Sequence, residues 1–161
     1  MLAVVQVGMA DLKVVKYPDK VMTAGLGSCV GVCLYDRRPQ IAGLAHIMLP
    51  SSQQTQNLKN PAKFADLAIE ILIQEMEKAG AKRRRTIAKI AGGSQMFSFS
   101  GESDIMKIGL RNSQAVIENL KRLNIRLVAS DIGGNHGRTI IFDSASGDLL
   151  VRTIGHGERI L

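Results

Sequence analysis

The chain has 161 residues, of which 45 % are apolar and 22 % charged, a balance typical of a soluble globular domain. This length favours one domain with a full hydrophobic core, and no apolar run approaches the ~20 residues that a membrane-spanning helix needs. A net charge of +7 would suit nucleic-acid binding, but only 4 % of residues are aromatic, so few side chains could stack on bases and we expect no nucleic-acid partner.

The N-terminal third of the sequence predicts strands. Residues 1–13, MLAVVQVGMADLK, lack the basic region of a signal peptide, which favours a cytoplasmic protein, and contain a predicted strand at 2–7. Two further strands are predicted at 29–35 and 41–49, separated by the turn-like DRRPQ. The polar segment 50–60 is predicted to be a loop.

The clearest helix is predicted from Pro61 to Lys78. Asn60 suits the N-cap, Pro61 suits the first turn and Gly80 suits the C-terminal end. Its apolar residues recur at steps of three and four and define the face expected to point inward: Phe64, Leu67, Ala68, Ile71, Leu72 and Met76.

The run KRRR at 82–85 supplies part of the positive charge. It is either a solvated loop that leads into the next strand, which we favour, or a surface that attracts an acidic protein partner.

The C-terminal half is predicted to contain a strand at 86–91, a helix at 112–123 with Val116, Leu120 and Leu123 inward, a strand at 125–130, and a hairpin of RTIIFD and DLLVRTI turned at Ser144–Gly147. The whole pattern predicts one domain, residues 1–161, of the α/β (α+β) class. We expect a layered sandwich of mixed β-sheet and at least two helices.

The two cysteines, Cys29 and Cys33, are four residues apart in a predicted strand. At ~3.3 Å per residue they would lie about 13 Å apart, too far for a disulfide, so we expect two free thiols. Together with three histidines at no familiar spacing, they do not predict a metal site.

A geometric test asks whether Cys29 and His46 share a face. If the strands at 29–35 and 41–49 form a hairpin in which paired residue numbers sum to 75, the two residues are directly opposite. At a sum of 77 they are diagonal neighbours, about 7–8 Å apart, and an even sum puts them on opposite faces. The sequence does not choose among these registers.

Such a pair would be chemically meaningful. An imidazole at His46 would take the proton of the Cys29 thiol, whose ordinary pKa is near ~8.5, and would later protonate a leaving amine. Gly27 would let a substrate carbonyl approach the backbone, and the N–H groups of Ser28 or Cys29 would stabilise the oxyanion. The alternative is that Cys29 and His46 are ordinary buried residues. The segment GLGSCVG lacks the lysine of a phosphate-binding loop, and Val30 stands where a dinucleotide fingerprint has its third glycine.

Several segments, in the same order, resemble the CheD family of chemoreceptor glutamine deamidases. TAGLGSCVGVCLYD is similar to the family's Thr-x-x-x-Gly-Ser-Cys-Val segment, and AGLAHIMLP to its Gly-x-x-His-x-x-Leu-Pro segment. Further similar segments are KFADLAIEILIQEMEKAGA, AKIAGGSQMF, IGLRN and DIGGNHGRTIIFDSASGDLLV. The resemblance therefore runs through almost the whole chain.

The resemblance implies a catalytic set of Cys29, His46 and Thr23, in a fold shared with certain toxin deamidases and without a cofactor. Cys29 would attack a receptor glutamine, His46 would move the proton, and Thr23 would orient the imidazole. Thr23 has a plainer alternative as a β-branched residue before a turn. Because a neutral hydroxyl stabilises an imidazolium less than a carboxylate does, we expect a modest thiolate population in the free enzyme.

The resemblance also implies two partners, the chemoreceptor cytoplasmic domain and a CheC-type phosphatase, with no required oligomer. The positive charge would favour docking on an acidic receptor coiled coil, which is our own hypothesis. The alternative to an enzyme is a non-catalytic or dual-role chemotaxis adaptor that binds these partners.

Two positions depart from the family pattern. Ser94 follows Gly92 and Gly93 where the family often has alanine, and Leu110 replaces a residue that is usually polar or small. The two glycines are expected to shape the rim of the site through backbone turns. Ser94 either forms local hydrogen bonds, which we favour, or contacts substrate. His136 is expected to be exposed and not catalytic. Arg111 and Asn112 either cap or pin the second helix, which we favour, or have a functional role.

Overall fold

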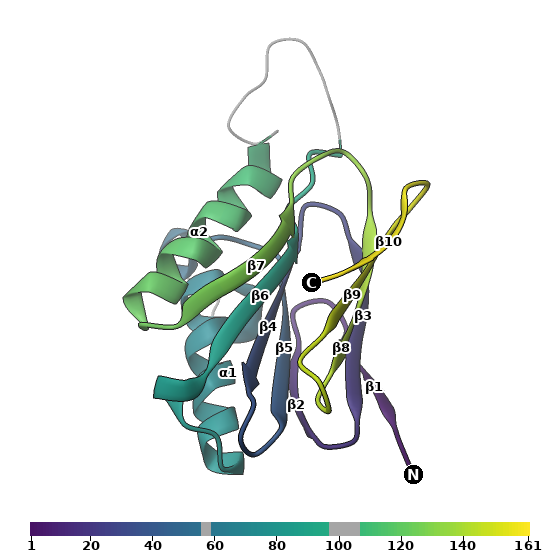
Figure 1. Cartoon of the computed structure of the whole chain (residues 1–161). Helices are drawn as coiled ribbons and strands as arrows, with labels where there is room; N and C mark the ends of the chain where they lie inside the picture. The colour runs from purple at the N-terminus through teal and green to yellow at the C-terminus, as the bar shows by residue number, and fades with distance from the viewer. Residues whose placement is uncertain (56–58, 97–106) are drawn as a thin grey trace.

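The computed structural model describes residues 1–55, 59–96 and 107–161. Two five-stranded sheets pack face to face, and two α-helices cover the outer face of one of them (Figure 1). This is the layered α+β sandwich that the sequence predicts, with two mixed sheets. Part of the predicted loop at 50–60, residues 56–58, lies outside the described residues. None of the helices in the described ranges is long and apolar enough to cross a membrane.

The first sheet has the strand order β1-β3-β8-β9-β10. Its strands are β1 (Val4–Gln6), β3 (Lys20–Leu26), β8 (Arg138–Asp143), β9 (Leu149–Thr153) and β10 (Gly157–Ile160). Only β1 and β3 are parallel among its described pairs. The predicted C-terminal hairpin is confirmed as β8 and β9.

The second sheet has the order β2-β5-β4-β6-β7. Its strands are β2 (Leu12–Lys16), β4 (Val30–Asp36), β5 (Ile41–Ile47), β6 (Ile87–Gly92) and β7 (Arg126–Ile132). The strands β4 and β5 are buried along their whole length, because this sheet lies between the helices and the first sheet. They form the hairpin that the geometric test supposes, and Gly31 pairs with His46. The register sum is therefore 77, the diagonal case.

The helices are α1 (Ala65–Ala79) and α2 (Ile108–Arg122), with short 3₁₀ turns η1 (Ser52–Gln54), η2 (Pro61–Lys63) and η3 (Arg83–Arg85). Gly80 ends α1 in a left-handed conformation at φ 117°, as predicted. The prediction that Asn60 caps this helix is wrong. Phe64 holds the N-cap position, because η2 interrupts the chain first, and the Asn60 side chain instead donates to the Ala10 carbonyl.

The inward face of α1 is rotated from the predicted one. Ile69 and Ile73 are fully buried, whereas Leu67 and Ile71 are only half-buried. The second helix begins four residues earlier than predicted, and Val116, Leu120 and Leu123 are buried as expected. Its first turn packs against the end of β6, where the position of Gly109 leaves no room for a side chain beside the Ser94 carbonyl.

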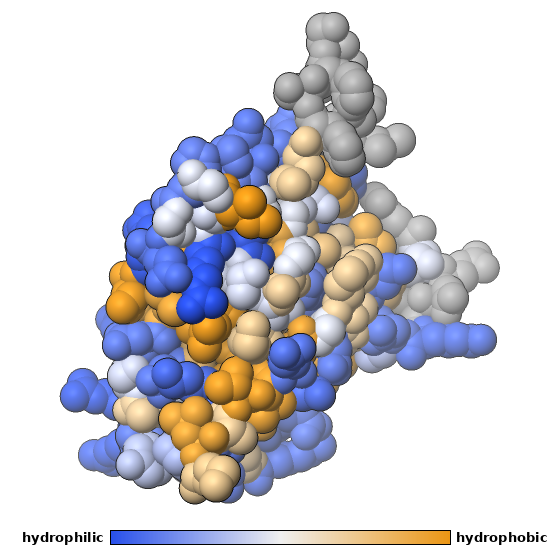
Figure 2. Space-filling model, turned by 90° about the vertical axis from the view of Figure 1, so that its right-hand side faces the viewer, coloured by the Kyte–Doolittle hydropathy of each residue, from blue (hydrophilic) through white to orange (hydrophobic). Residues whose placement is uncertain are grey.

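The outer face of the first sheet is not covered by a described helix. Met22, Ile141 and Leu150 are paired across three strands and point away from the second sheet, because their chain neighbours are buried, and exposed Ile160 on β10 pairs with Leu150. Figure 2 looks onto the side where β1 and β10 lie and shows apolar side chains gathered over its lower part. The molecule thus has one helix-covered face and one open, partly apolar face.

Candidate active site

The candidate nucleophile and base come from neighbouring strands of the second sheet. Cys29 lies one residue before β4, and His46 lies on β5 opposite Gly31, so the two are diagonal neighbours. In this relation the side chains leave the same face and their tips are within reach of each other. That face points toward the first sheet, from which Thr23 on β3 points back. All three residues are buried, with exposed fractions of 9 %, 0 % and 2 % for Cys29, His46 and Thr23.

The hydrogen bonds of Thr23 determine which ring nitrogen of His46 carries the proton. The Thr23 hydroxyl donates to the Val7 carbonyl over 2.7 Å, and its oxygen also lies 2.7 Å from His46 Nδ1. A hydroxyl has one proton, so at the second contact Thr23 must accept and Nδ1–H must donate. The lone pair of the neutral imidazole is therefore on Nε2, which has no hydrogen-bond partner among the described residues.

The backbone of His46 is held as firmly as its ring. Its N–H donates to the Asp11 carbonyl over 3.0 Å, and its carbonyl accepts from the Ala10 N–H over 3.1 Å. These bonds extend the β2–β5 ladder by one step beyond Leu12. The imidazole is consequently fixed from two sides, by its own strand and by the opposite sheet.

Burial keeps both reacting groups neutral. It raises the pKa of the Cys29 thiol above its ordinary value, with the Cys29 backbone N–H acting weakly in the other direction. It also lowers the pKa of His46. The resting pair is therefore a thiol and a neutral imidazole, which agrees with the modest thiolate population expected from the sequence.

The loop that carries Cys29 is fixed by its carbonyl groups. Three successive carbonyls accept hydrogen bonds from distant segments: Gly27 from the Ser94 N–H at 2.8 Å, Ser28 from Asn112 Nδ2 at 2.9 Å, and Cys29 from the Gly93 N–H at 2.9 Å. With the carbonyls turned outward to these donors, the N–H groups of Ser28 and Cys29 have no acceptor among the described residues outside Cys29 itself. The Gly27 N–H differs, because it donates to the Gly25 carbonyl.

Gly92 and Gly93 make the close approach of β6 to this loop sterically feasible. A Cβ at Gly92 would lie 2.2 Å from the Cys29 carbonyl oxygen, and one at Gly93 would lie 2.0 Å from Ser113 Oγ. Both glycines also have positive φ values, 115° and 65°. Their place in the structure accords with the expected backbone turns.

Ser94 lies inside the protein and not on its surface, with an exposed fraction of 0 %. Its hydroxyl is 2.6 Å from the His136 carbonyl and accepts from Arg138 Nη1 at 2.7 Å. Arg138 is itself buried and also bonds the Gly92 and Gly133 carbonyls and Asp131. Ser94 thus joins the two glycine-rich loops, in keeping with the favoured local role.

Asn112 links the two catalytic segments. Its Nδ2 donates to the Ser28 carbonyl and, at 3.0 Å, to the Met48 carbonyl, so one amide group spans the loop before Cys29 and the chain after His46. Asn112 is fully buried, and its Oδ1 has no partner among the described residues. From the sequence, Asn112 either caps or pins the helix or has a functional role. The capping prediction is wrong, because α2 begins at Ile108 and Lys107 holds the N-cap position. The sequence feature that points to Asn112 is the position of a polar residue on the apolar face of α2.

The remaining predicted positions lie around this centre. Half-exposed Leu110 lines a hollow of about 350 Å³ together with Gly93 and Gly133. His136 is only partly exposed, and its Nε2 lies 2.7 Å from Nε2 of His156. Over the described ranges, no group of three or more His, Cys, Asp or Glu side chains is placed to hold a metal ion. The two cysteines are free thiols, as predicted.

Comparisons with known proteins place this geometry in context. The sequence profile described as CheD chemotactic sensory transduction matches residues 48–153. A protein of Syntrophomonas wolfei subsp. wolfei named probable chemoreceptor glutamine deamidase CheD is 63 % identical over 161 residues, which is all of both chains. A protein of the same name from Clostridium botulinum strain Hall is 55 % identical over 155 residues, 96 % of each chain.

Proposed function

The chain belongs to the CheD family, and we propose that it is a chemoreceptor glutamine deamidase, which hydrolyses glutamine carboxamides of receptors to glutamate and ammonia. The observation that carries this proposal is the hydrogen-bond relay from the Val7 carbonyl through Thr23 to His46. The relay leaves Nε2 as a lone-pair acceptor on the face that Cys29 shares. A nucleophile beside an oriented base is the arrangement that acyl transfer requires.

The first half-reaction forms a thioester. Nε2 takes the proton of the Cys29 thiol as Sγ attacks the carboxamide carbon, and a C–S bond forms. The same proton is then given to the amide nitrogen, the C–N bond breaks and ammonia leaves. Burial disfavours separated charges in the free enzyme, so we propose that proton transfer accompanies attack and does not precede it.

The second half-reaction restores the enzyme. Nε2 removes a proton from water as the water oxygen attacks the thioester carbon. The C–S bond breaks, the receptor side chain leaves as glutamate, and the Cys29 sulfur regains its proton. In both halves, the N–H groups of Ser28 and Cys29 are the proposed donors to the oxyanion, because neither has another protein acceptor in the described part of the chain. Gly27 would contribute by leaving the backbone accessible.

The partners follow from the same proposal. The substrate is the cytoplasmic domain of a chemoreceptor, the enzyme acts in the cytoplasm, and residues 1–161 serve as one deamidase domain. We propose a CheC-type phosphatase as a second partner, which the family resemblance supports. Co-purification of the two proteins tests this, and failure to associate at micromolar concentration would remove that partner.

The deamidase reaction is tested on a receptor cytoplasmic fragment. Mass spectrometry should detect the mass gain of NH₂ replaced by OH at specific glutamines, with release of ammonia. Cys29→Ala should abolish both signals. Cys33→Ala is the matched control, since Cys33 is a fully buried cysteine on β4, four residues after Cys29, and the variant should retain the activity if it folds. Deamidation that survives in Cys29→Ala would overturn the proposal.

A further inference from the structure

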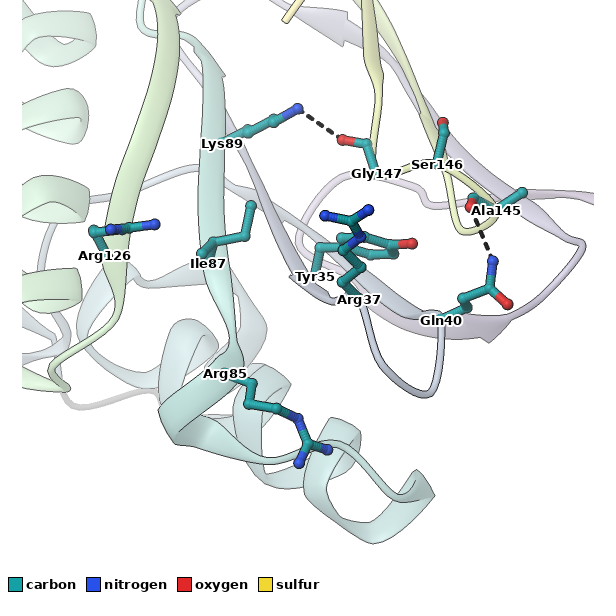
Figure 3. A pocket seen from close by; sticks show the side chains of 10 residues that line it. All are labelled: Tyr35, Arg37, Gln40, Arg85, Ile87, Lys89, Arg126, Ala145, Ser146 and Gly147. Atoms are coloured by element: carbon teal, nitrogen blue, oxygen red, sulfur yellow. Dashed lines mark hydrogen bonds between the residues drawn. The ribbon is translucent and has the colours of Figure 1, made fainter.

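A cavity at a distance from Cys29 is lined by residues of both sheets. It has a volume of about 760 Å³ and opens between the two sheets at the other end of β4, beside Tyr35 (Figure 3). Six residues of extended chain separate Tyr35 from Cys29, or about 20 Å at ~3.3 Å per residue. A ligand in this cavity would therefore not touch the reacting atoms.

The cavity wall carries four cationic side chains and no carboxylate. Arg37 comes from the β4–β5 turn, Arg85 from η3, Lys89 from β6 and Arg126 from the start of β7. Asp143 and Asp148 line a different hollow, on the outer face of the first sheet, but their charges and that of Asp36 also reach Tyr35 in this wall and partly offset the cations. The cavity is thus a concentration of positive charge in a chain that is itself basic.

Two of these cations already have partners. Arg85 bonds Asp36 through Nε and Nη2, and in Figure 3 its side chain points away from the other lining residues. Lys89 Nζ donates to the Gly147 carbonyl at 2.8 Å and to the main-chain oxygen of Leu161, the last residue of the sequence, at 2.7 Å. These contacts hold Lys89 in the wall and leave it one further N–H donor.

The side chains of Arg37 and Arg126 are exposed and make no hydrogen bond or ion pair with any described residue, although the backbone of Arg126 pairs with Ile87. Two nearby carbonyl acceptors already have other donors. Gln40 Nε2 donates to the Ala145 carbonyl, and the Tyr35 hydroxyl donates to the Ser144 carbonyl. In Figure 3 the two guanidinium groups lie on either side of Ile87. Two guanidinium forks without partners facing one cavity form a receptor for an anion.

We propose that this cavity, defined by Arg37, Lys89 and Arg126, binds an organic phosphate of about the size of a mononucleotide. Guanidinium forks match phosphate oxygens in pairs, and Lys89 supplies a third point of charge. The volume lies in the range of about 300–1,000 Å³ that is usual for small-molecule sites, and it exceeds what a bare phosphate fills. Ile87 and Gln40 offer an apolar and an amide surface to the rest of the ligand.

Titration calorimetry at low salt tests this with pyrophosphate, ADP and adenosine as probes. Pyrophosphate and ADP should bind, since the phosphoryl groups carry the recognition, and adenosine should not. Arg37→Gln and Arg126→Gln should each weaken binding by about tenfold or more, the usual effect of losing a charged hydrogen bond. Arg38→Gln is the matched control, because Arg38 is exposed in the same turn but does not line the cavity.

Three results would overturn the proposal. They are no binding of either phosphate, equal weakening by Arg38→Gln and Arg37→Gln, and binding of a tetraglutamate peptide more tightly than ADP, which would make this an acidic-peptide site. The Cys29→Ala variant distinguishes this cavity from the proposed active site. It should bind ADP with unchanged affinity whatever the outcome of the deamidation assay.

Discussion

At the scale of single residues, one hydroxyl proton determines the state of the candidate base. Thr23 directs its proton to Val7 and thereby makes His46 a donor at Nδ1. Thr23→Val keeps the shape but removes the acceptor, leaving Nδ1–H buried without a partner and favouring the wrong tautomer. We expect kcat for deamidation to fall by about 10²-fold, within the range of general acid–base contributions, with KM little changed.

Two comparisons make this prediction specific. Thr23→Ser retains the hydroxyl and should stay within a few-fold of the natural protein, and Thr139→Val, on the outward face of β8, should have no effect on kcat. Ammonia release under single-turnover conditions measures all three. Equal rates for Thr23→Val and Thr23→Ser would show that the hydroxyl does not orient the ring.

The pKa shifts predict how Cys29 reacts before substrate binds. Because burial raises the pKa of this thiol above its ordinary value of ~8.5, the rate of iodoacetamide alkylation should climb through neutral pH and reach its midpoint above that value. A Cys33→Ala background leaves Cys29 as the only thiol. A reactive plateau that extends below pH 7 would instead indicate a preformed thiolate–imidazolium pair.

The lowered pKa of His46 also affects stability, and the direction follows from proton binding. Below about pH 6.5, the ordinary value, the unfolded chain binds a proton at this histidine more readily than the folded chain does. Stability should therefore decrease as pH falls through this region toward the lower folded-state pKa. Urea unfolding should show that the free energy of unfolding falls less between pH 7.5 and pH 5 in His46→Gln than in the natural protein. An identical loss of unfolding free energy in the two proteins would contradict the lowered pKa of His46.

At the scale of elements, α2 does more than cover the sheet. Through Asn112 it holds the segment before Cys29 and the segment after His46 at a fixed separation. The amide orientation is determined by the structure, since two carbonyl oxygens can be satisfied only by the NH₂ group. Asn112 therefore acts as a positioning residue for the proposed reaction.

Asn112→Asp tests this role with almost no change of volume. A carboxylate cannot donate to the two carbonyls, so we expect kcat to drop by about tenfold or more and stability to decrease by about 1–3 kcal/mol. Asn119→Asp, two turns later on the same helix, is half-exposed and should cost much less. The kcat and KM values of both variants, with thermal unfolding, distinguish positioning from general destabilisation: a loss of stability with unchanged kcat would rule out positioning.

The end of β6 gives a second element-scale prediction. Gly92→Ala combines an unfavourable positive φ with a Cβ 2.2 Å from the Cys29 carbonyl, so it should destabilise the protein by about 2–5 kcal/mol and impair turnover. Gly134→Ala shares the positive φ, but open space surrounds it, so its cost should stay near about 1–2 kcal/mol. Chemical denaturation measures both. Equal losses of unfolding free energy in the two variants would mean that the loop before Cys29 shifts easily to make room for the added methyl group.

At the scale of the whole molecule, local pattern predicted much of the fold. The apolar runs CVGVCLY and IAGLAHIML, separated by a turn-like segment, predicted the two central strands, and the helical spacing predicted α1. The strands that went unpredicted, β2, β3 and β10, contain lysines, glycines or glutamate and lack a long apolar run. They are strands because of the partners to which they pair, and those partners are remote in sequence.

The candidate site, like the fold, could be predicted from the sequence only in part. Residue alternation shows that Cys29 and His46 share a face whenever the register sum is odd, but the choice of 77 depends on the turn across DRRPQ. That Thr23 faces His46 from another sheet depends on the pairing of β3 with β8, more than a hundred residues away. The Val7 carbonyl carries no side-chain signal at all, so no motif could have revealed it.

Net charge gives the one prediction that belongs to the molecule as a whole. With +7 at neutral pH, association with an acidic receptor coiled coil should weaken as salt is raised from low to physiological levels. KM for a receptor fragment should rise while kcat stays constant. A KM that is indifferent to salt would mean that docking does not use the charge.

The bond between Thr23 and His46 crosses from one sheet to the other. A slide of the two layers by about one bond length would release the imidazole while every strand ladder remained intact. On heating, turnover should therefore stop at a lower temperature than the one at which the strands unfold. The alignment of the layers is itself a working part of the proposed catalyst.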